Sequence, residues 1–438
     1  MTFGFISAWL LVAAIGLSPR FTAGMIPGGK SLDIRVEDVL LAILLPIALT
    51  GWMVHPGQGR RWHQAERLFI AWIVIAGAGV ILNALVSDLD IVRGVFFFLK
   101  DVEYLCFFVF VAHNVRTRKD VERLVRLMLW VTAVHSAWIA IEVVLGLRWT
   151  AWYGPTIFTE PTGPLPSGGF MLLMLLLGLN LWIYRDASLL RRLVPAVFAV
   201  APVLGVWTSG SRASLMGLVT GVVAVALLFA LKRGASPRGV GLAAIAAAIF
   251  VATSPTLLDS LESTQLGSRR LLNVSEYAYE MNADVSSSRV HIWEGETDAM
   301  LERPFSLVLG FGKSYQLTGE SHSQYINVLK ETGIVGFLVF SGLILVVWRH
   351  AWSAFFAAED GLAVGVHATV LSATVALAFV GITNEVLMVA KVAAPYWVLV
   401  GLSIGIDAAG IGPVARLPLA EPAGRAPLPA WRPSVLAR

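Results

Sequence analysis

Polar and charged residues stand in four segments of this sequence where a strongly apolar chain would otherwise avoid them. The first is VWTSGSRASLMG at 206–217, where Ser211 and Arg212 lie between two apolar stretches. A tight turn of small hydroxylated residues leaves backbone N–H groups free, and with a guanidinium they form a site for an anion. The simpler interpretation is an arginine that extends toward the membrane interface.

The second segment is SSSRVHIWEGETDAMLERP at 286–304, whose apolar positions recur at helical spacing. Serines precede the pattern as possible N-caps and Pro304 ends it, so an amphipathic helix is predicted. We expect Arg289 in its first turn, where a cation opposes the helix dipole and a bound anion would reverse the balance. The alternative is a surface arginine paired with Asp284 or a glutamate.

The third segment is ESHSQYINVLKETGIVG at 320–336. His322 stands just before an apolar run, and a polar stripe follows at four-residue spacing: Ser323, Asn327, Lys330 and Glu331. That spacing predicts one polar helix face turned toward the interior of a bundle. Histidine, with an ordinary pKa of about 6.5, is suited to accept a proton from a hydroxyl near neutral pH. Taken alone, an interfacial histidine would be the simpler interpretation.

The fourth segment is LKDVEYL at 99–105, which places Lys100, Asp101 and Glu103 inside an apolar run. Lys100 and Glu103 are spaced to pair on one helix face, so a structural ion pair is expected and a substrate cavity is the alternative.

Two further patterns do not match the chemistry that they suggest. GFGKS at 310–314 looks like the end of a phosphate loop, but Leu307 stands where the first glycine is needed. The acids between 284 and 298 do not form a compact metal-binding motif. We therefore expect no obligatory metal and no cofactor.

The elements that position these residues follow from composition. Hydrophobic residues make up 57% of the 438 residues and charged residues only 14%, which excludes a soluble globular protein. The single cysteine, Cys106, excludes an internal disulfide. Apolar runs of about 20 residues match the length that crosses a bilayer as a helix. They predict about twelve helices, near 3–19, 37–54, 67–86, 94–112, 125–146, 168–184, 194–208, 213–231, 239–253, 324–348, 362–382 and 389–406.

The predicted fold class is thus an all-α polytopic membrane protein. Basic residues gather in every second loop, which favours both termini in the cytoplasm. The expected organisation is membrane helices over 1–253, a large periplasmic loop with short amphipathic helices over 254–323, membrane helices over 324–406 and a disordered tail over 407–438. A second outside stretch, 147–167, carries Arg148. Membrane lipids are expected partners, and nucleic acid is not.

The order of these features resembles the superfamily of O-antigen ligases and Wzy O-antigen polymerases. The motifs that carry the resemblance are TSGSRASLMGL, a long outside loop with an arginine, a tryptophan, a proline and Gly-x-Gly, and HSQYINVLKETGIVG. In the last of these, His322, Ser323, Gly333 and Gly336 fit the ligase pattern of spacing. The segment DIRVEDVLL near the N-terminus also looks typical of the superfamily.

The resemblance implies a metal-independent, inverting glycosyltransferase of the GT-C type in the bacterial inner membrane. Its donor would be a glycan on undecaprenyl diphosphate, and its acceptor a sugar hydroxyl on the periplasmic face. By motif, Arg212 and Arg289 would hold the diphosphate and His322 would orient or deprotonate the acceptor. Ser211, Ser323, Glu331 and Arg148 are candidates for support of the site.

Two questions stay open at this point. A ligase would use lipid A core as acceptor and a polymerase a second lipid-linked repeat, and the motifs do not decide between them, although the histidine motif favours a ligase. A secondary transporter or flippase would also have many helices and buried charges. Transporters bind near the middle of the membrane, whereas the polar segments here gather on the outside face.

Overall fold

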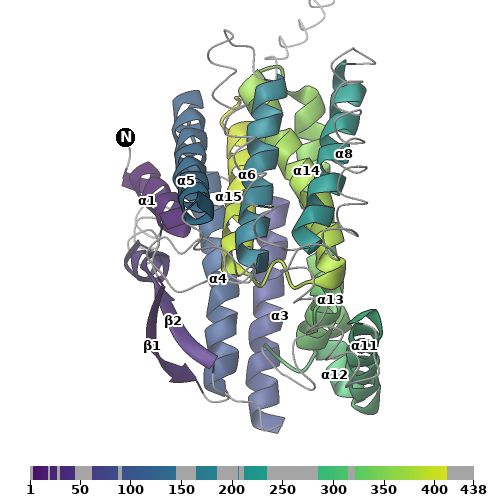
Figure 1. The fold of residues 1–438 in the computed structure, drawn as a ribbon. Helices are drawn as coiled ribbons and strands as arrows, with labels where there is room; N and C mark the ends of the chain where they lie inside the picture. Colours follow the sequence, from purple (N-terminus) through teal and green to yellow (C-terminus); the bar gives the residue numbers. More distant parts are fainter. Residues whose placement is uncertain are drawn as a thin grey trace, which may run out of the picture.

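The computed structural model describes residues 3–17, 20–26, 30–44, 62–86, 91–144, 164–184, 206, 212–233, 285–313 and 321–411 (Figure 1). Its helices are α1 (Phe3–Leu17), a helix over 36–44, α3 (Gln64–Val86), α4 (Ile91–Asn114), α5 (Arg118–Val144), α6 (Pro164–Tyr184), α8 (Arg212–Arg233), α11 (Val285–Glu302), α12 (Pro304–Leu309), α13 (Gln324–Ala357), α14 (Gly361–Thr383) and α15 (Ala390–Ala408). Apart from α11 and α12, they fall where the apolar runs predict helices. The helix expected near 239–253 and almost all of that near 194–208 lie outside the described residues.

Five of the described helices are long and apolar enough to cross a membrane: α3, α8, α13, α14 and α15. Shorter apolar helices run over Gly4–Ile15 and Gly168–Tyr184. Long apolar helices that satisfy their own backbone are the structures that a bilayer accepts. The described fold is therefore that of a helical, polytopic membrane protein.

The structure also contains a two-stranded hairpin, which the predicted all-α fold class did not include. β1 (Arg20–Ile26) pairs antiparallel with β2 (Lys30–Arg35), and the register irregularity falls between Thr22 and Gly24. Apolar runs do not predict it, because this stretch holds none long enough to count as a helix. In Figure 1 the hairpin lies at the same end of the bundle as α11 and α12.

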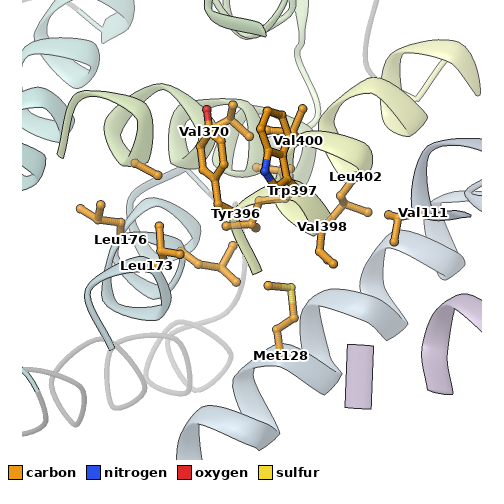
Figure 2. Packing of buried hydrophobic residues seen from close by; sticks show 14 of the residues in the cluster. Val111, Met128, Leu173, Leu176, Val370, Tyr396, Trp397, Val398, Val400 and Leu402 are labelled. Atoms are coloured by element: carbon orange, nitrogen blue, oxygen red, sulfur yellow. The ribbon is translucent and has the colours of Figure 1, made fainter. Parts of the chain in front are cut away.

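The core of the bundle is built around α14 and α15, whose side chains are almost all buried. Figure 2 shows Tyr396, Trp397 and Val398 of α15 packed among apolar side chains of the neighbouring helices. Gly401 allows α15 to approach α4 closely, since a Cβ there would lie 2.5 Å from the Phe108 carbonyl oxygen. Such small-residue contacts are how membrane helices gain close packing without a hydrophobic driving force between them.

Helix α8 runs antiparallel to α14, so the start of α8 lies beside the end of α14 and the end of α8 lies beside its start. At one end, Lys232 Nζ of α8 donates to the Ala358 carbonyl oxygen at 2.7 Å, just before α14 begins. At the other end, a Cβ on Gly217 of α8 would lie 2.6 Å from Val380 Cγ2 near the end of α14. The first residue of α8, Arg212, is therefore at the end of the bundle where α14 finishes.

Candidate functional site

The start of α13 lies at this same end of the bundle. Tyr325 Oη donates to the Ala378 carbonyl oxygen of α14 at 2.9 Å, and Gln324 Oε1 accepts from the Leu387 backbone N–H at 2.8 Å. His322, two residues before α13, thus stands beside the end of α14, as Arg212 does. Two of the residues that the motifs single out, more than 100 positions apart in the sequence, share one end of the bundle.

Helix α11 contacts the segment that carries His322. Trp293 Nε1 donates to the Ser321 carbonyl oxygen at 2.7 Å. Arg289 precedes Trp293 by four residues, so its backbone lies about one helical turn from that of Trp293. A helix is confirmed where one was predicted over 286–304, but it begins at Val285, so Arg289 is its fifth residue and lies beyond the expected first turn. Helix ends are the part of a pattern that local sequence fixes least.

A buried ion pair joins α11 to α13. Lys330 Nζ lies 2.8 Å from Glu296 Oε1 and 2.6 Å from Ser321 Oγ, and Ser321 Oγ donates to Glu296 Oε1 at 2.8 Å. Glu296 and Ser321 are 0% exposed and Lys330 is 2% exposed. In the sequence Glu296 is one of several loop acids, and its only signal is that it shares a helix face with Trp293 and Met300.

Helix α13 is kinked at Gly333, which has φ +64°. A straight helix would bond the Lys330 and Glu331 carbonyls to the N–H groups four residues on. Here they accept from Phe311 and Gly312 instead, with N···O distances of 2.7 and 3.1 Å. A side chain at Gly333 would place its Cβ 2.3 Å from the Val308 carbonyl, so both the angle and the close approach require glycine.

The kink at Gly333 divides α13 into a short arm next to His322 and a longer arm that is suited to cross a membrane. The stretch of α13 after Gly333 is by itself long enough to cross a hydrocarbon core of about 30 Å. The polar stripe that the sequence predicts lies on the N-cap residue Ser323 and on the arm before the kink, 324–332. Ser323, Asn327, Lys330 and Glu331 are all buried, which confirms that this face turns inward.

A second buried lysine, Lys313, pairs with the residue that follows Lys330, also before the kink. Lys313 Nζ is 2.7 Å from Asp101 Oδ2 of α4 and 2.7 Å from Glu331 Oε2 of α13, and it lies 4.8 Å from the centre of the Trp72 ring. Burial lowers the pKa of Lys313, but the two carboxylates outweigh it and hold the pKa above its ordinary value. The GFGKS segment therefore supplies a structural cation. The expected pairing of Lys100 with Glu103 is confirmed at 2.8 Å.

His322 has a left-handed backbone, with φ +48°, and is the non-glycine residue with positive φ among those described. Such conformations are uncommon outside glycine and concentrate at functional sites. Its side chain is half-buried. Ser211 and Arg148, two of the candidates for support, lie outside the described residues. Within the described ranges no group of three or more His, Cys, Asp or Glu side chains is arranged to hold a metal ion.

The family model described as O-antigen ligase matches residues 196–341. The match confirms the resemblance and spans α8, α11, α12 and the first part of α13. Arg212, Arg289 and His322 all lie within it. A comparison with curated proteins gave no match.

Proposed function

We propose that this chain is a membrane glycosyltransferase that moves a glycan from undecaprenyl diphosphate to a sugar hydroxyl, as an O-antigen ligase with lipid A core as acceptor. The observation that carries the proposal is the arrangement of three sequence-distant segments at one end of the bundle. The starts of α8 and α13 flank the end of α14, and α11 bonds the residue next to His322. The family match over the same segments supports it.

The chemistry needs a site for a dianionic leaving group. When the bond between the anomeric carbon and the phosphate oxygen breaks, its electron pair leaves on undecaprenyl diphosphate. A guanidinium matches phosphate oxygens with two parallel N–H groups, so Arg212 and Arg289 would stabilise the charge that develops. Arg212 is also the first residue of α8, where the helix dipole favours an anion.

The acceptor needs a base on the opposite side of the anomeric carbon. In our proposal His322 orients the acceptor hydroxyl and takes its proton as the oxygen attacks, which inverts the configuration and requires no metal. Ser323, Glu331, Ser211 and Arg148 are proposed support residues. Glu331 is held by Lys313 and Ser323 is 3% exposed, so both would act by fixing the start of α13, which follows His322 directly.

The surroundings of the site are part of the same proposal. The apolar helix walls would hold the polyprenyl tail, and membrane lipids would cover the outer faces of about twelve helices. The site would face the periplasm from the bacterial inner membrane, with both termini in the cytoplasm and the segment 254–323 as the periplasmic loop. A polymerase that extends a lipid-linked repeat would use the same donor site and differ in its acceptor.

The test is transfer in detergent with purified protein, a chelator and an undecaprenyl-diphosphate glycan, with either lipid A core or a second lipid-linked repeat as acceptor. We expect product with lipid A core and a loss of at least about 100-fold in kcat/KM for Arg212→Ala, Arg289→Ala and His322→Ala. The matched control is Arg118→Ala, an exposed arginine paired with Asp360 at the opposite end of α14.

Each other outcome has a definite meaning. Product only with the second lipid-linked repeat would make the chain a polymerase. Full activity in the three variants would overturn the proposed site. If folded wild-type protein transferred the glycan to neither acceptor, the transporter hypothesis would be favoured over the glycosyltransferase.

A further inference from the structure

We infer that Glu296, Ser321 and Lys330 form a positioning unit, here called the α11 clamp, that sets His322 relative to Arg289. The inference rests on the proposed function and adds to it residues that act through others. The clamp joins the side chains of three segments: α11, the loop before α13, and the arm of α13 before its kink.

The desolvation of the buried ion pair in the clamp costs too much free energy for stability alone to account for it. A buried ion pair loses its hydration, and well-packed apolar residues of similar size hold two helices together equally well or better. Both partners here are essentially inaccessible to solvent, and the Ser321 hydroxyl bonds both of them, at 2.6 Å from Lys330 Nζ and 2.8 Å from Glu296 Oε1. What an ion pair supplies and apolar contact does not is a fixed direction and a fixed distance between the groups that it joins.

The groups that it joins are those next to the proposed chemistry. Ser321 is the peptide neighbour of His322 and is held twice, by its hydroxyl in the clamp and by its carbonyl oxygen, which accepts from Trp293 Nε1 at 2.7 Å. With Ser321 fixed on both sides, the left-handed backbone of His322 is fixed at its start. Trp293 and Arg289 are one turn apart on α11, so the contacts of Trp293 also hold the stretch of helix backbone that carries Arg289.

The kink in α13 holds the backbone of Lys330, the third member of the α11 clamp. The carbonyl oxygen of Lys330 accepts from the Phe311 backbone N–H at 2.7 Å, so the lysine is held by its backbone as well as by its ammonium group. A displacement of about 1 Å between reacting groups can cost on the order of 100-fold in rate. The α11 clamp therefore keeps the base and the diphosphate-binding arginine at a working separation.

Ser321→Ala is the sharpest test, because it removes the link to His322 and leaves the direct Lys330–Glu296 contact of 2.8 Å in place. We expect kcat for glycan transfer to fall about 10- to 100-fold, with KM for the lipid-linked donor within threefold of wild type. A substitution that only loosened the fold would lower the amount of folded protein and leave kcat per folded molecule unchanged.

A second variant approaches Ser321 from the other side. Trp293→Phe keeps an aromatic ring and removes the N–H that holds the Ser321 carbonyl, and we expect a smaller fall in kcat in the same direction. The matched control is Thr369→Ala in α14, a fully buried hydroxyl that donates to the Gly365 carbonyl within its own helix at 2.7 Å. We expect its kcat to equal that of wild type.

The outcomes separate the inference from the proposed function. If Ser321→Ala and Trp293→Phe keep the wild-type kcat while Arg212→Ala and His322→Ala are inactive, the clamp is overturned and the glycosyltransferase stands. A rise in donor KM with unchanged kcat would also overturn the clamp, because it would indicate a direct role in donor binding. Full activity in Arg212→Ala and His322→Ala would overturn the proposed function and the clamp with it.

Discussion

Two buried lysines, Lys330 in α13 just before its kink and Lys313 in the segment after α12, differ in what they join. Lys313 pairs with Asp101 of α4 and Glu331 of α13, which belong to the helical bundle itself. Lys330 pairs with Glu296 of α11 and with the hydroxyl of Ser321, both next to the proposed site. A buried lysine–carboxylate pair thus holds helices of the bundle together in one place and positions a loop in the other.

The number of carboxylates at each lysine explains the difference. Lys313 is the single cation between two buried carboxylates, so its removal leaves two negative groups without compensation. Lys330 faces one carboxylate, and the Ser321 hydroxyl completes its coordination. We therefore expect substitutions at the first cluster, around Lys313, to change stability most. Substitutions at the second cluster, around Lys330, should change activity most.

Lys313→Met should have the largest effect on stability. Breaking a buried ion pair by removing one partner costs about 3–5 kcal/mol, and here two carboxylates are left unpaired. Thermal unfolding of the purified protein in detergent measures the loss. The matched control is Lys313→Met combined with Asp101→Asn and Glu331→Gln, which should regain most of the stability. An unchanged unfolding temperature in Lys313→Met would show that the first cluster does not close the bundle.

Gly333→Ala should have the next largest effect, because both lysine clusters depend on the kink. A residue other than glycine at φ +64° and ψ −172° costs about 1–3 kcal/mol, and the close approach of the Val308 carbonyl adds to this. The matched control is Gly342→Ala, which lies in the regular part of α13 with no atom within 4 Å of the added Cβ. There we expect equal or slightly higher stability. Similar unfolding curves for the two variants would contradict the requirement for a kink.

Ser321→Ala should separate stability from activity. Loss of a buried hydroxyl that bonds charged groups costs about 1.5–3 kcal/mol, below the effect of Lys313→Met. Its kcat should nevertheless fall more than that of any variant of similar stability outside the proposed site. Equal falls in kcat for variants of equal stability, wherever they lie, would remove the distinction between the two clusters.

Arg118→Ala should have the smallest effect. Arg118 Nε lies 3.0 Å from Asp360 Oδ2, but the arginine side chain is 56% exposed. Exposed ion pairs contribute about 0–1 kcal/mol, so both unfolding temperature and transfer activity should remain near wild type. A large loss of stability here would mean that exposed pairs at this end matter as much as the buried lysines do.

Local sequence predicted much of this molecule and left specific parts undecided. The long apolar helices followed from apolar runs, and the inward polar face of α13 followed from its four-residue spacing. The hairpin at 20–35 and the start of α11 at Val285 did not, because short strands and helix ends leave weak local signals. Gly333 was part of the motif that suggested the family, and only its φ of +64° explains why glycine stands there.

The sequence by itself determined that the chain is a helical membrane protein and that Arg212, Arg289 and His322 belong to motifs of one family. Hydropathy and spacing are local properties, so they can be read without coordinates. Only the tertiary structure decided that Lys313 reaches Asp101, more than 200 positions away, and that Lys330 reaches Glu296 and Ser321. The choice of partner for a buried charge depends on which helices pack together, and that is set by the whole bundle.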